Sequence, residues 1–256
     1  MNHYSVGSWS FHGLFHAGKM NLFGYLETMK YRYRLQHADI WNGMLLSTET
    51  PYIQSIADTL QEEEMKVACL SVDAADVWHD DPAIRERSHE RALTYLAIAR
   101  SWGVDTLRID MGVNTISMSD EQLEFLANRY RQYASIASDY GFRVGPQTHQ
   151  LGSQSPANLR RLNDAVASDA FGIVLNVNRW EVDGERGDEI VAPFTMHAQF
   201  DRAFVDFTGA QLQQKVQLLK DKGYEGCWSL EYRGGSNEYL EVEHDLLTIR
   251  RAVRQA

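Results

Sequence analysis

Short apolar runs along this 256-residue chain are followed by side chains that can form hydrogen bonds or transfer protons. Gln147 and His149 follow one such run in GPQTHQ, and Glu231 follows another in WSLEYR. An imidazole or a carboxylate can serve as an acid or a base, whereas an amide can only form hydrogen bonds. The other polar residues in such places include His12, Arg108, Asp110, Asn176, Arg179, His197, Gln199 and Arg233.

Five of the six tryptophans lie in or beside the same places. They are Trp9, Trp41, Trp78, Trp180 and Trp228. Aromatic faces stack on the C–H faces of a sugar, while its hydroxyl groups need polar partners. The combination predicts a binding site for a sugar or polyol. The alternative is that these large rings only fill space at one end of the fold.

A repeated phrase indicates which elements position these residues. A helical stretch ends at a glycine, a short apolar strand follows, and the strand runs out into polar residues. Gly103, Gly141 and Gly223 occupy the glycine position of this phrase. Glycine adopts the left-handed conformation that caps helices, and apolar runs of this length suit strands covered on both faces. In a parallel β/α barrel, the carboxyl ends of such strands face the active site.

The complete pattern predicts a single-domain α/β protein, a (β/α)8 TIM barrel over residues 1–256. The predicted strands span residues 4–10, 38–41, 66–72, 106–110, 143–146, 171–176, 194–200 and 227–230. The predicted helices span residues 21–33, 50–64, 81–102, 119–140, 155–167, 209–222 and 238–254, and residues 178–193 are predicted to form a loop, with room for a short helix. No GxGxxG follows the first strand, so a dinucleotide-binding fold has little support.

Composition excludes several classes of protein. The formal net charge of −10 argues against nucleic-acid binding, which needs a basic surface. The sequence has no secretory leader and no apolar run long enough to span a membrane. The two cysteines, Cys69 and Cys227, lie in predicted buried strands and are expected to be core residues. We therefore expect a cytoplasmic protein.

Several segments together resemble the xylose isomerase-like barrel family. They are WSFHG, ADIWNGM, SVDAADVWHDDP, DTLRIDMG, GPQTHQ, FGIVLNVNRW, MHAQF and GCWSLEY. This family contains sugar isomerases and epimerases, some dehydratases and lyases, and the endonuclease IV group. The resemblance implies a divalent ion held by Glu, Asp, His and Glu at the ends of strands five to eight. The matching positions carry Gln147, Asn176, either His197 or Gln199, and Glu231.

These replacements indicate a degenerate metal site. The usual ligands supply three negative charges, and this chain supplies one, from Glu231. Losing two anions opposite a dication weakens binding strongly. We therefore expect no tightly bound cofactor. Weak binding of Mg²⁺ or Ca²⁺ through amide oxygens stays open, and a tightly bound Mn²⁺ would show this interpretation to be wrong.

The resemblance implies a carbohydrate-processing protein of the isomerase, epimerase or lyase type. Gln147 cannot accept a proton, so we expect Glu231 to act as the base and His149 or His197 as the acid. The expected substrate contacts are Trp9, His12, Trp41, Trp78, Arg108, Asp110, Arg179, Trp180 and Arg233.

Other interpretations stay open at this point. In one, Glu231 only forms an ion pair with an arginine. In another, the histidines at the barrel mouth only make structural hydrogen bonds. In a third, Asp110 only pairs with Arg108. The whole chain is alternatively a catalytically silent homologue that binds a sugar or serves as a partner subunit. A homo-oligomer is compatible with either function, and endonuclease activity is disfavoured by the acidic charge.

Overall fold

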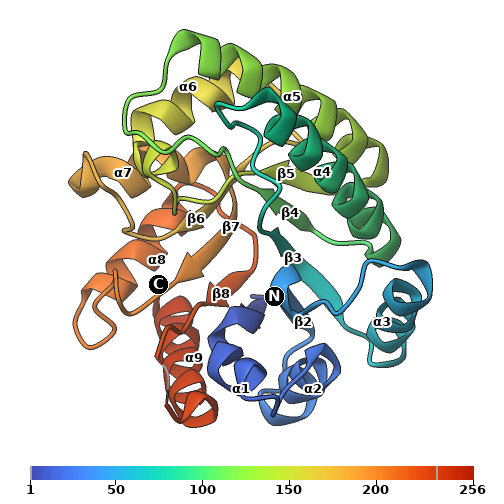
Figure 1. Cartoon of the computed structure of the whole chain (residues 1–256). Coiled ribbons are helices and arrows are strands. Elements are labelled where there is room, and N and C mark those ends of the chain that lie inside the picture. The colour runs from blue at the N-terminus through green and yellow to red at the C-terminus, as the bar shows by residue number, and fades with distance from the viewer. Residues whose placement is uncertain (1, 235) are drawn as a thin grey trace.

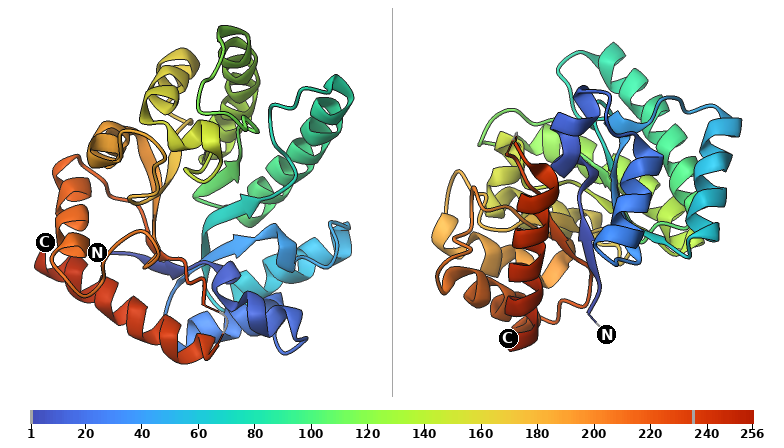
Figure 2. Two further views of the ribbon diagram at one scale, coloured as in Figure 1. Left: turned by 60° about the vertical axis from the view of Figure 1, so that its left-hand side comes forward. Right: turned by 90° about the horizontal axis from the view of Figure 1, so that it is seen from below.

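The computed structural model describes residues 2–234 and 236–256, and it forms a closed barrel of parallel strands surrounded by helices (Figure 1). The strands of the described chain are β1 (Tyr4–Val6), β2 (His37–Trp41), β3 (Lys66–Val72), β4 (Thr106–Ile109), β5 (Arg143–Gly145), β6 (Ile173–Asn176), β7 (Thr195–Phe200) and β8 (Trp228–Leu230). In the right-hand view of Figure 2 both termini lie at the lower end of the barrel, and α1 (His12–His16) lies toward the opposite end.

The α-helices alternate with the strands, as the sequence predicts. They are α1, α2 (Leu22–Glu27), α3 (Thr50–Glu62), α4 (Pro82–Trp102), α5 (Asp120–Tyr140), α6 (Pro156–Val166), α7 (Gly184–Val191), α8 (Gln211–Asp221) and α9 (Glu238–Gln255). Short 3-10 or π-helical turns are η1 (Ser8–Phe11), η2 (Thr28–Arg32), η3 (Asn42–Met44), η4 (Leu151–Gln154) and η5 (Ala192–Phe194).

Two four-stranded parallel sheets make up the barrel wall, in the orders β1-β8-β7-β6 and β2-β3-β4-β5. Single bridges join the sheets at both seams. Gly7 pairs with Asp39 at one seam, and Val144 with Phe171 and Gln147 with Val174 at the other. The wall is therefore closed, and the polar residues that follow neighbouring strands are brought to one mouth.

Local sequence signals explain the helix ends. The Ser119 side chain accepts from the Gln122 N–H, and the Gln122 side chain accepts from the Ser119 N–H, which is a complete capping box. Gly103 and Gly141 end α4 and α5 in the left-handed region, with φ of 61° and 76°. Their lack of a Cβ makes this conformation inexpensive, so the predicted glycine caps are confirmed at both positions.

The structure differs from the sequence prediction after the first strand, where η1 and α1 follow β1, and it confirms the short helix allowed for in residues 178–193. Strand β1 ends at Val6 rather than Ser10, because the Ser10 N–H turns back to the Gly7 carbonyl and starts η1. This turn carries Trp9 over the barrel mouth. The segment predicted mainly as a loop contains α7, which is amphipathic and buries Val191 against the barrel.

Polar side chains occupy much of the barrel interior. Alternate residues of a strand point to the same face, and in several strands the residues that point inward are polar. Along β3 and β4 the interior positions are Cys69, Ser71 and Asp73, then Thr106, Arg108 and Asp110; along β7 and β8 they are His197, Gln199 and Asp201, then Cys227, Ser229 and Glu231. Most TIM barrels fill this space with branched apolar residues. The polar layers therefore require a continuous hydrogen-bonded network.

The seam between β5 and β6 depends on close backbone approach. A Cβ at Gly145 would lie 1.8 Å from the carbonyl oxygen of Gly172. We expect Gly145→Ala to lower the free energy of unfolding by about 2–3 kcal/mol, because the strands must separate to admit the methyl group. Gly24→Ala in α2 is the matched control, since its Cβ would meet nothing closer than 3.6 Å. Urea denaturation of both variants measures the difference, and equal stabilities would contradict this account.

No helix among the described residues is long and apolar enough to cross a membrane.

Candidate functional site

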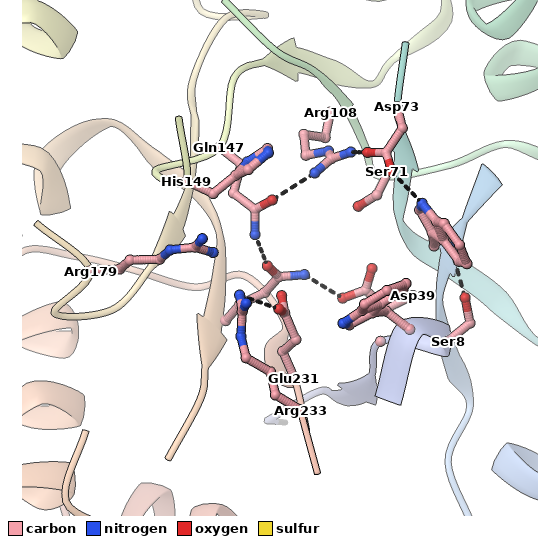
Figure 3. A pocket seen from close by; sticks show the side chains of 14 residues that line it. Ser8, Asp39, Ser71, Asp73, Arg108, Gln147, His149, Arg179, Glu231 and Arg233 are labelled. Atoms are coloured by element: carbon pink, nitrogen blue, oxygen red, sulfur yellow. Dashed lines mark hydrogen bonds and ion pairs between the residues drawn. The ribbon is translucent and has the colours of Figure 1, made fainter. Parts of the chain in front are cut away.

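A cavity of about 180 Å³ opens at the carboxyl ends of the strands (Figure 3). Its lining is mostly polar, with aromatic rings on one side. The lining residues are Gly7, Ser8, Trp9, Asp39, Trp41, Ser71, Asp73, Arg108, Gln147, His149, Arg179, Gln199, Glu231 and Arg233. The volume suits a small ligand, because a water molecule accounts for about 30 Å³ of liquid.

Trp9 and Trp41 form the aromatic wall. Their rings meet edge to face with centroids 4.8 Å apart. The Trp41 indole N–H donates to Asp73 at 2.6 Å, which fixes the plane of the ring. A Cβ at Gly43 would lie 2.1 Å from this ring, so the turn after β2 needs glycine for close approach. The wall offers a rigid stacking surface for a small ligand.

A continuous chain of hydrogen bonds crosses the cavity floor from Asp73 to Asp39. Arg108 pairs with Asp73 and donates to the Gln147 side-chain oxygen at 2.7 Å. The Gln147 amide then donates to the Gln199 oxygen, as Figure 3 shows. Both amide oxygens therefore already accept a hydrogen bond, and a guanidinium lies beside one of them.

Asp39 ends this chain in the barrel interior. A register shift between Ala38 and Asp39 in β2 occurs at this residue. Its carboxylate accepts from Ser229 at 2.6 Å, from Gln199 at 3.3 Å, and contacts His197 Nε2 at 2.8 Å. Burial alone would raise the pKa of Asp39, but the charge and hydrogen bonds of these partners lower it below the ordinary value.

Asp39, Cys69 and His197 also form a buried group whose potential ligand atoms lie within 4.8 Å of one another. Burial raises the pKa of the Cys69 thiol to about 12. Without a bound cation the Cys69 thiol is therefore protonated near pH 7.

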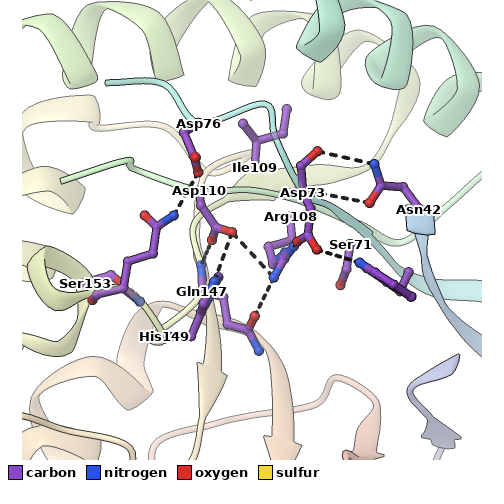
Figure 4. Close-up of polar contacts among 12 residues, drawn as sticks. Asn42, Ser71, Asp73, Asp76, Arg108, Ile109, Asp110, Gln147, His149 and Ser153 are labelled. Atoms are coloured by element: carbon purple, nitrogen blue, oxygen red, sulfur yellow. Dashed lines mark hydrogen bonds and ion pairs between the residues drawn. The ribbon is translucent and has the colours of Figure 1, made fainter. Parts of the chain in front are cut away.

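His149 lies beside Asp110 on the opposite side of the mouth (Figure 4). Its Nε2 is 3.6 Å from a carboxylate oxygen of Asp110, which also lies 3.4 Å from Arg108. Burial lowers the pKa of His149, and the Asp110 charge only partly opposes this effect. The imidazole is therefore neutral near pH 7, and a neutral imidazole can still donate its N–H.

Glu231 follows β8 and points into the cavity (Figure 3). Arg233 donates to its carboxylate at 2.7 Å and also pairs with the buried Asp201. Burial raises the pKa of Glu231, although the Arg233 charge acts in the opposite direction. The ion-pair interpretation of Glu231 is thus correct as geometry, and it leaves a carboxyl group whose proton affinity is raised.

The structure brings together many of the sequence-predicted residues. Those that line the cavity are Trp9, Trp41, Arg108, Gln147, His149, Arg179, Gln199, Glu231 and Arg233. Asp110 lies directly behind this surface, where it accepts from the Gln147 backbone N–H and pairs with Arg108. Its predicted ion pair with Arg108 is present.

Five further predicted residues lie outside the cavity lining. The Trp78 indole faces Asp80 and Phe125, and the Trp180 indole donates to Asp188 at 2.8 Å. His12 stacks on the outer side of Trp9. Asn176 is fully buried beside Gln199 in the β6–β7 register, and His197 points inward two residues before Gln199. Both side chains face the barrel interior, and Gln199 rather than His197 lines the cavity because it is closer to the carboxyl end of β7.

The sequence-based prediction assigns no role to Ser8, Asp39, Ser71 or Asp73, which all line the cavity. A charged residue inside the apolar run HADIW was the available signal for Asp39, because an unpaired buried carboxylate is costly. The period-two pattern Cys69-x-Ser71-x-Asp73 was the signal for the other strand.

A comparison with protein families matches residues 35–252 to the xylose isomerase-like TIM barrel. The chain belongs to this family. No curated protein matches the sequence significantly.

Solved structures share the fold at low sequence identity. The IOLI protein with a bound zinc atom has a TM-score of 0.75 at 14% identity, covering 99% of this chain and 97% of its own. L-ribulose 3-epimerase has a TM-score of 0.74 at 13% identity, covering 100% and 97%. The probable 3-DHS dehydratase AsbF of Bacillus anthracis has a TM-score of 0.73 at 13% identity, covering 97% and 98%.

Proposed function

We propose that this xylose isomerase-like barrel is a carbohydrate-processing enzyme of the isomerase or lyase type, working by proton transfer without a tightly bound divalent ion. Glu231 is the base and His149 the acid. The observation that carries the proposal is that both groups line one cavity, with a raised pKa at Glu231 and a lowered pKa at His149. Acid–base groups are most effective when their pKa values lie near the working pH, and the shift at Glu231 is in that direction.

The reaction starts with a C–H bond next to a carbonyl group. The Glu231 carboxylate takes the proton, and the electron pair moves to the carbonyl oxygen as an enolate. The neutral His149 imidazole donates its N–H to that oxygen. Return of the proton from Glu231 to the former carbonyl carbon, with the proton of the neighbouring hydroxyl passing by way of His149 to the former carbonyl oxygen, moves the carbonyl group by one carbon and gives isomerisation. Departure of a β-hydroxyl as water, with the proton carried by Glu231, gives elimination.

Two-base epimerisation is not part of this proposal. It requires a second proton acceptor on the opposite face of the carbon, and the Gln147 amide cannot take up a proton. The Gln147 side chain is instead held between Arg108 and Gln199. Its role in the proposal is to orient hydroxyl or carbonyl groups of the substrate.

The four positions that correspond to the family metal site do not fit a divalent ion. Gln147 and Gln199 already use their amide oxygens as acceptors, and the Arg108 guanidinium lies 2.7 Å from one of these oxygens. Asn176 does not line the cavity, and only Glu231 carries charge. We therefore propose that no step of the reaction depends on a metal at this site.

Metal titration tests this part of the proposal. We expect 1 mM Mn²⁺ or Zn²⁺ to leave the thermal unfolding temperature unchanged. A site with a Kd of about 10 μM would instead stabilise the protein by about 2.7 kcal/mol at that concentration. The variant carrying Gln147→Glu, Asn176→Asp and Gln199→His should gain a response to Mn²⁺. A response of the unaltered protein would contradict the proposal.

Proton exchange tests the catalytic part. The protein is incubated with candidate hydroxylated carbonyl compounds in D₂O, and NMR measures the deuterium incorporated at carbon. We expect incorporation next to the carbonyl group. Glu231→Gln should abolish the exchange. Binding of a ligand without exchange would favour a second function, a catalytically silent sugar-binding protein. The saturated chain from Asp73 to Gln199 supports that second candidate, because it immobilises groups that a reaction would use.

A further inference from the structure

Arg179 differs from the other charged residues of the cavity in having no partner of opposite charge. Arg108 pairs with Asp73 and Asp110, and Arg233 pairs with Asp201 and Glu231. Within residues 2–234 and 236–256, no carboxylate oxygen lies within 4.0 Å of the Arg179 guanidinium, and its Nε is buried without a hydrogen-bond acceptor. The charges of Glu231, Asp201 and Asp110 act on Arg179 only from beyond ion-pair distance, so a ligand that places an anion in direct contact with it would be stabilised here.

The backbone after β6 holds Arg179 in this orientation. Asn178 has a positive φ of 65°, and its N–H donates to Asp188 at 2.9 Å. Its side-chain amide donates to the Phe204 carbonyl at 2.6 Å. The Arg179 guanidinium packs over the Phe204 ring at 5.0 Å. Figure 3 shows the side chain extending into the cavity, so its position is set before a ligand binds.

A second unpartnered group lies on the same strand end. The Oδ1 and Nδ2 atoms of Asn176 are both buried without a hydrogen-bond partner. Asn176 is in register with Gln199, so both side chains point toward the barrel interior. Buried amides are normally satisfied, and an unsatisfied one beside a cavity indicates a missing partner.

We infer that the ligand carries a carboxylate, held by the fork of Arg179 at the β6 side of the cavity. This inference rests on the proposed function above and narrows its substrate class to a small hydroxylated acid, such as a sugar acid. A guanidinium fork matches a carboxylate with two parallel hydrogen bonds. The cavity of about 180 Å³ limits the ligand to a small compound.

A phosphate group is the other source of an oxyanion. In many barrels, phosphate binds backbone N–H groups near the end of the eighth strand and the helix that follows. Here the Glu238 carboxylate at the start of α9 accepts from the Gly13 and Leu14 N–H groups at 2.8 and 2.9 Å. A phosphate there would compete with an internal carboxylate, which favours a carboxylate ligand at Arg179.

Calorimetric titration of the intact protein tests the inference with matched pairs. D-Gluconate, D-galactonate and D-glucuronate are compared with D-glucitol, galactitol and D-glucose. We expect each acid to bind about 10- to 100-fold more tightly than its neutral partner at low salt, as a charge-assisted contact provides. Arg179→Met should remove this preference and leave neutral binding within about threefold. Arg186→Met is the matched control, because it removes a solvent-exposed arginine on α7 outside the cavity.

Three results would overturn the inference: equal affinity for acids and neutral partners, no binding of any acid at 10 mM, or a preference that persists in both Arg179→Met and Arg179→Gln. Tighter binding of D-glucose 6-phosphate than of every acid, lost in both variants, would assign the site to phosphate instead. Proton exchange is scored separately. Acid preference without exchange rejects the enzymatic proposal alone, and exchange without acid preference rejects the carboxylate inference alone.

Discussion

Glu231→Gln is expected to lower the rate of carbon–deuterium exchange about 10²- to 10⁴-fold and, at the same time, to stabilise the folded protein at pH 7. The loss of rate follows because an amide cannot accept the proton. The gain in stability follows because the buried carboxylate is desolvated, which is the main cause of its raised pKa. Replacing a functional residue that is held in an unfavourable environment commonly raises stability and lowers activity.

The pH dependence fixes the sign of the stability effect. A raised pKa in the folded state means that the fold favours the protonated form of Glu231. Its stabilising contribution is therefore complete below the unfolded pKa, near 4.3, and is lost as pH rises through the folded value. The stability difference between Glu231→Gln and the unaltered protein should grow from pH 4 to pH 7.

Thermal unfolding at several pH values and exchange by NMR measure the two effects independently. Glu124→Gln is the control, since Glu124 is exposed on α5 and far in sequence from the strand ends. It should change neither quantity. A Glu231→Gln variant that is less stable than the unaltered protein at pH 7 would show that the Arg233 ion pair outweighs desolvation, and retained exchange would exclude Glu231 as the base.

The fold was predictable from sequence because each element carries its own local signal. Ser119 with Gln122 starts a helix, Gly103 and Gly141 end helices, and the apolar runs between them have the length of strands. Family resemblance rested on the same segments. By contrast, β1 ended early because the Ser10 N–H bonds to the Gly7 carbonyl and starts η1, which the apolar pattern of residues 4–10 does not reveal.

The site was predictable only at the ends of the strands. Glu231, His149 and Arg179 were found because each follows an apolar run, and that rule selects the outermost layer. Asp39 and Ser71 were missed because they lie one or two residues inside their strands. The partners that decide their chemistry are remote in sequence, as His197 and Ser229 are from Asp39. The register between strands decides which side chains meet across a barrel, and short-range sequence patterns do not reveal that register.

Asp39→Asn is expected to destabilise the fold by about 1–3 kcal/mol at pH 7, because it removes a buried carboxylate that accepts hydrogen bonds from its neighbours. Ser229, Gln199 and His197 all contact one oxygen of the Asp39 carboxylate, so the amide oxygen of Asn must serve them as an uncharged and weaker acceptor. Asp39 is also the last member of the hydrogen-bonded chain that runs from Asp73 through Gln147 along the cavity floor. We therefore expect the variant to have a less ordered cavity floor and a lower affinity for ligands, as well as a lower stability.

Acid titration provides a second, independent readout of Asp39. The folded-state pKa of Asp39 is lowered, so its contribution is present above the unfolded pKa of about 3.9 and is lost as pH falls through the folded value. Urea denaturation at pH 7, 5 and 3 should therefore show a difference between Asp39→Asn and the unaltered protein that shrinks at the lowest pH. Asp58→Asn on the exposed side of α3 is the control. A pH-independent difference would mean that packing, rather than the carboxylate charge, holds the barrel interior together.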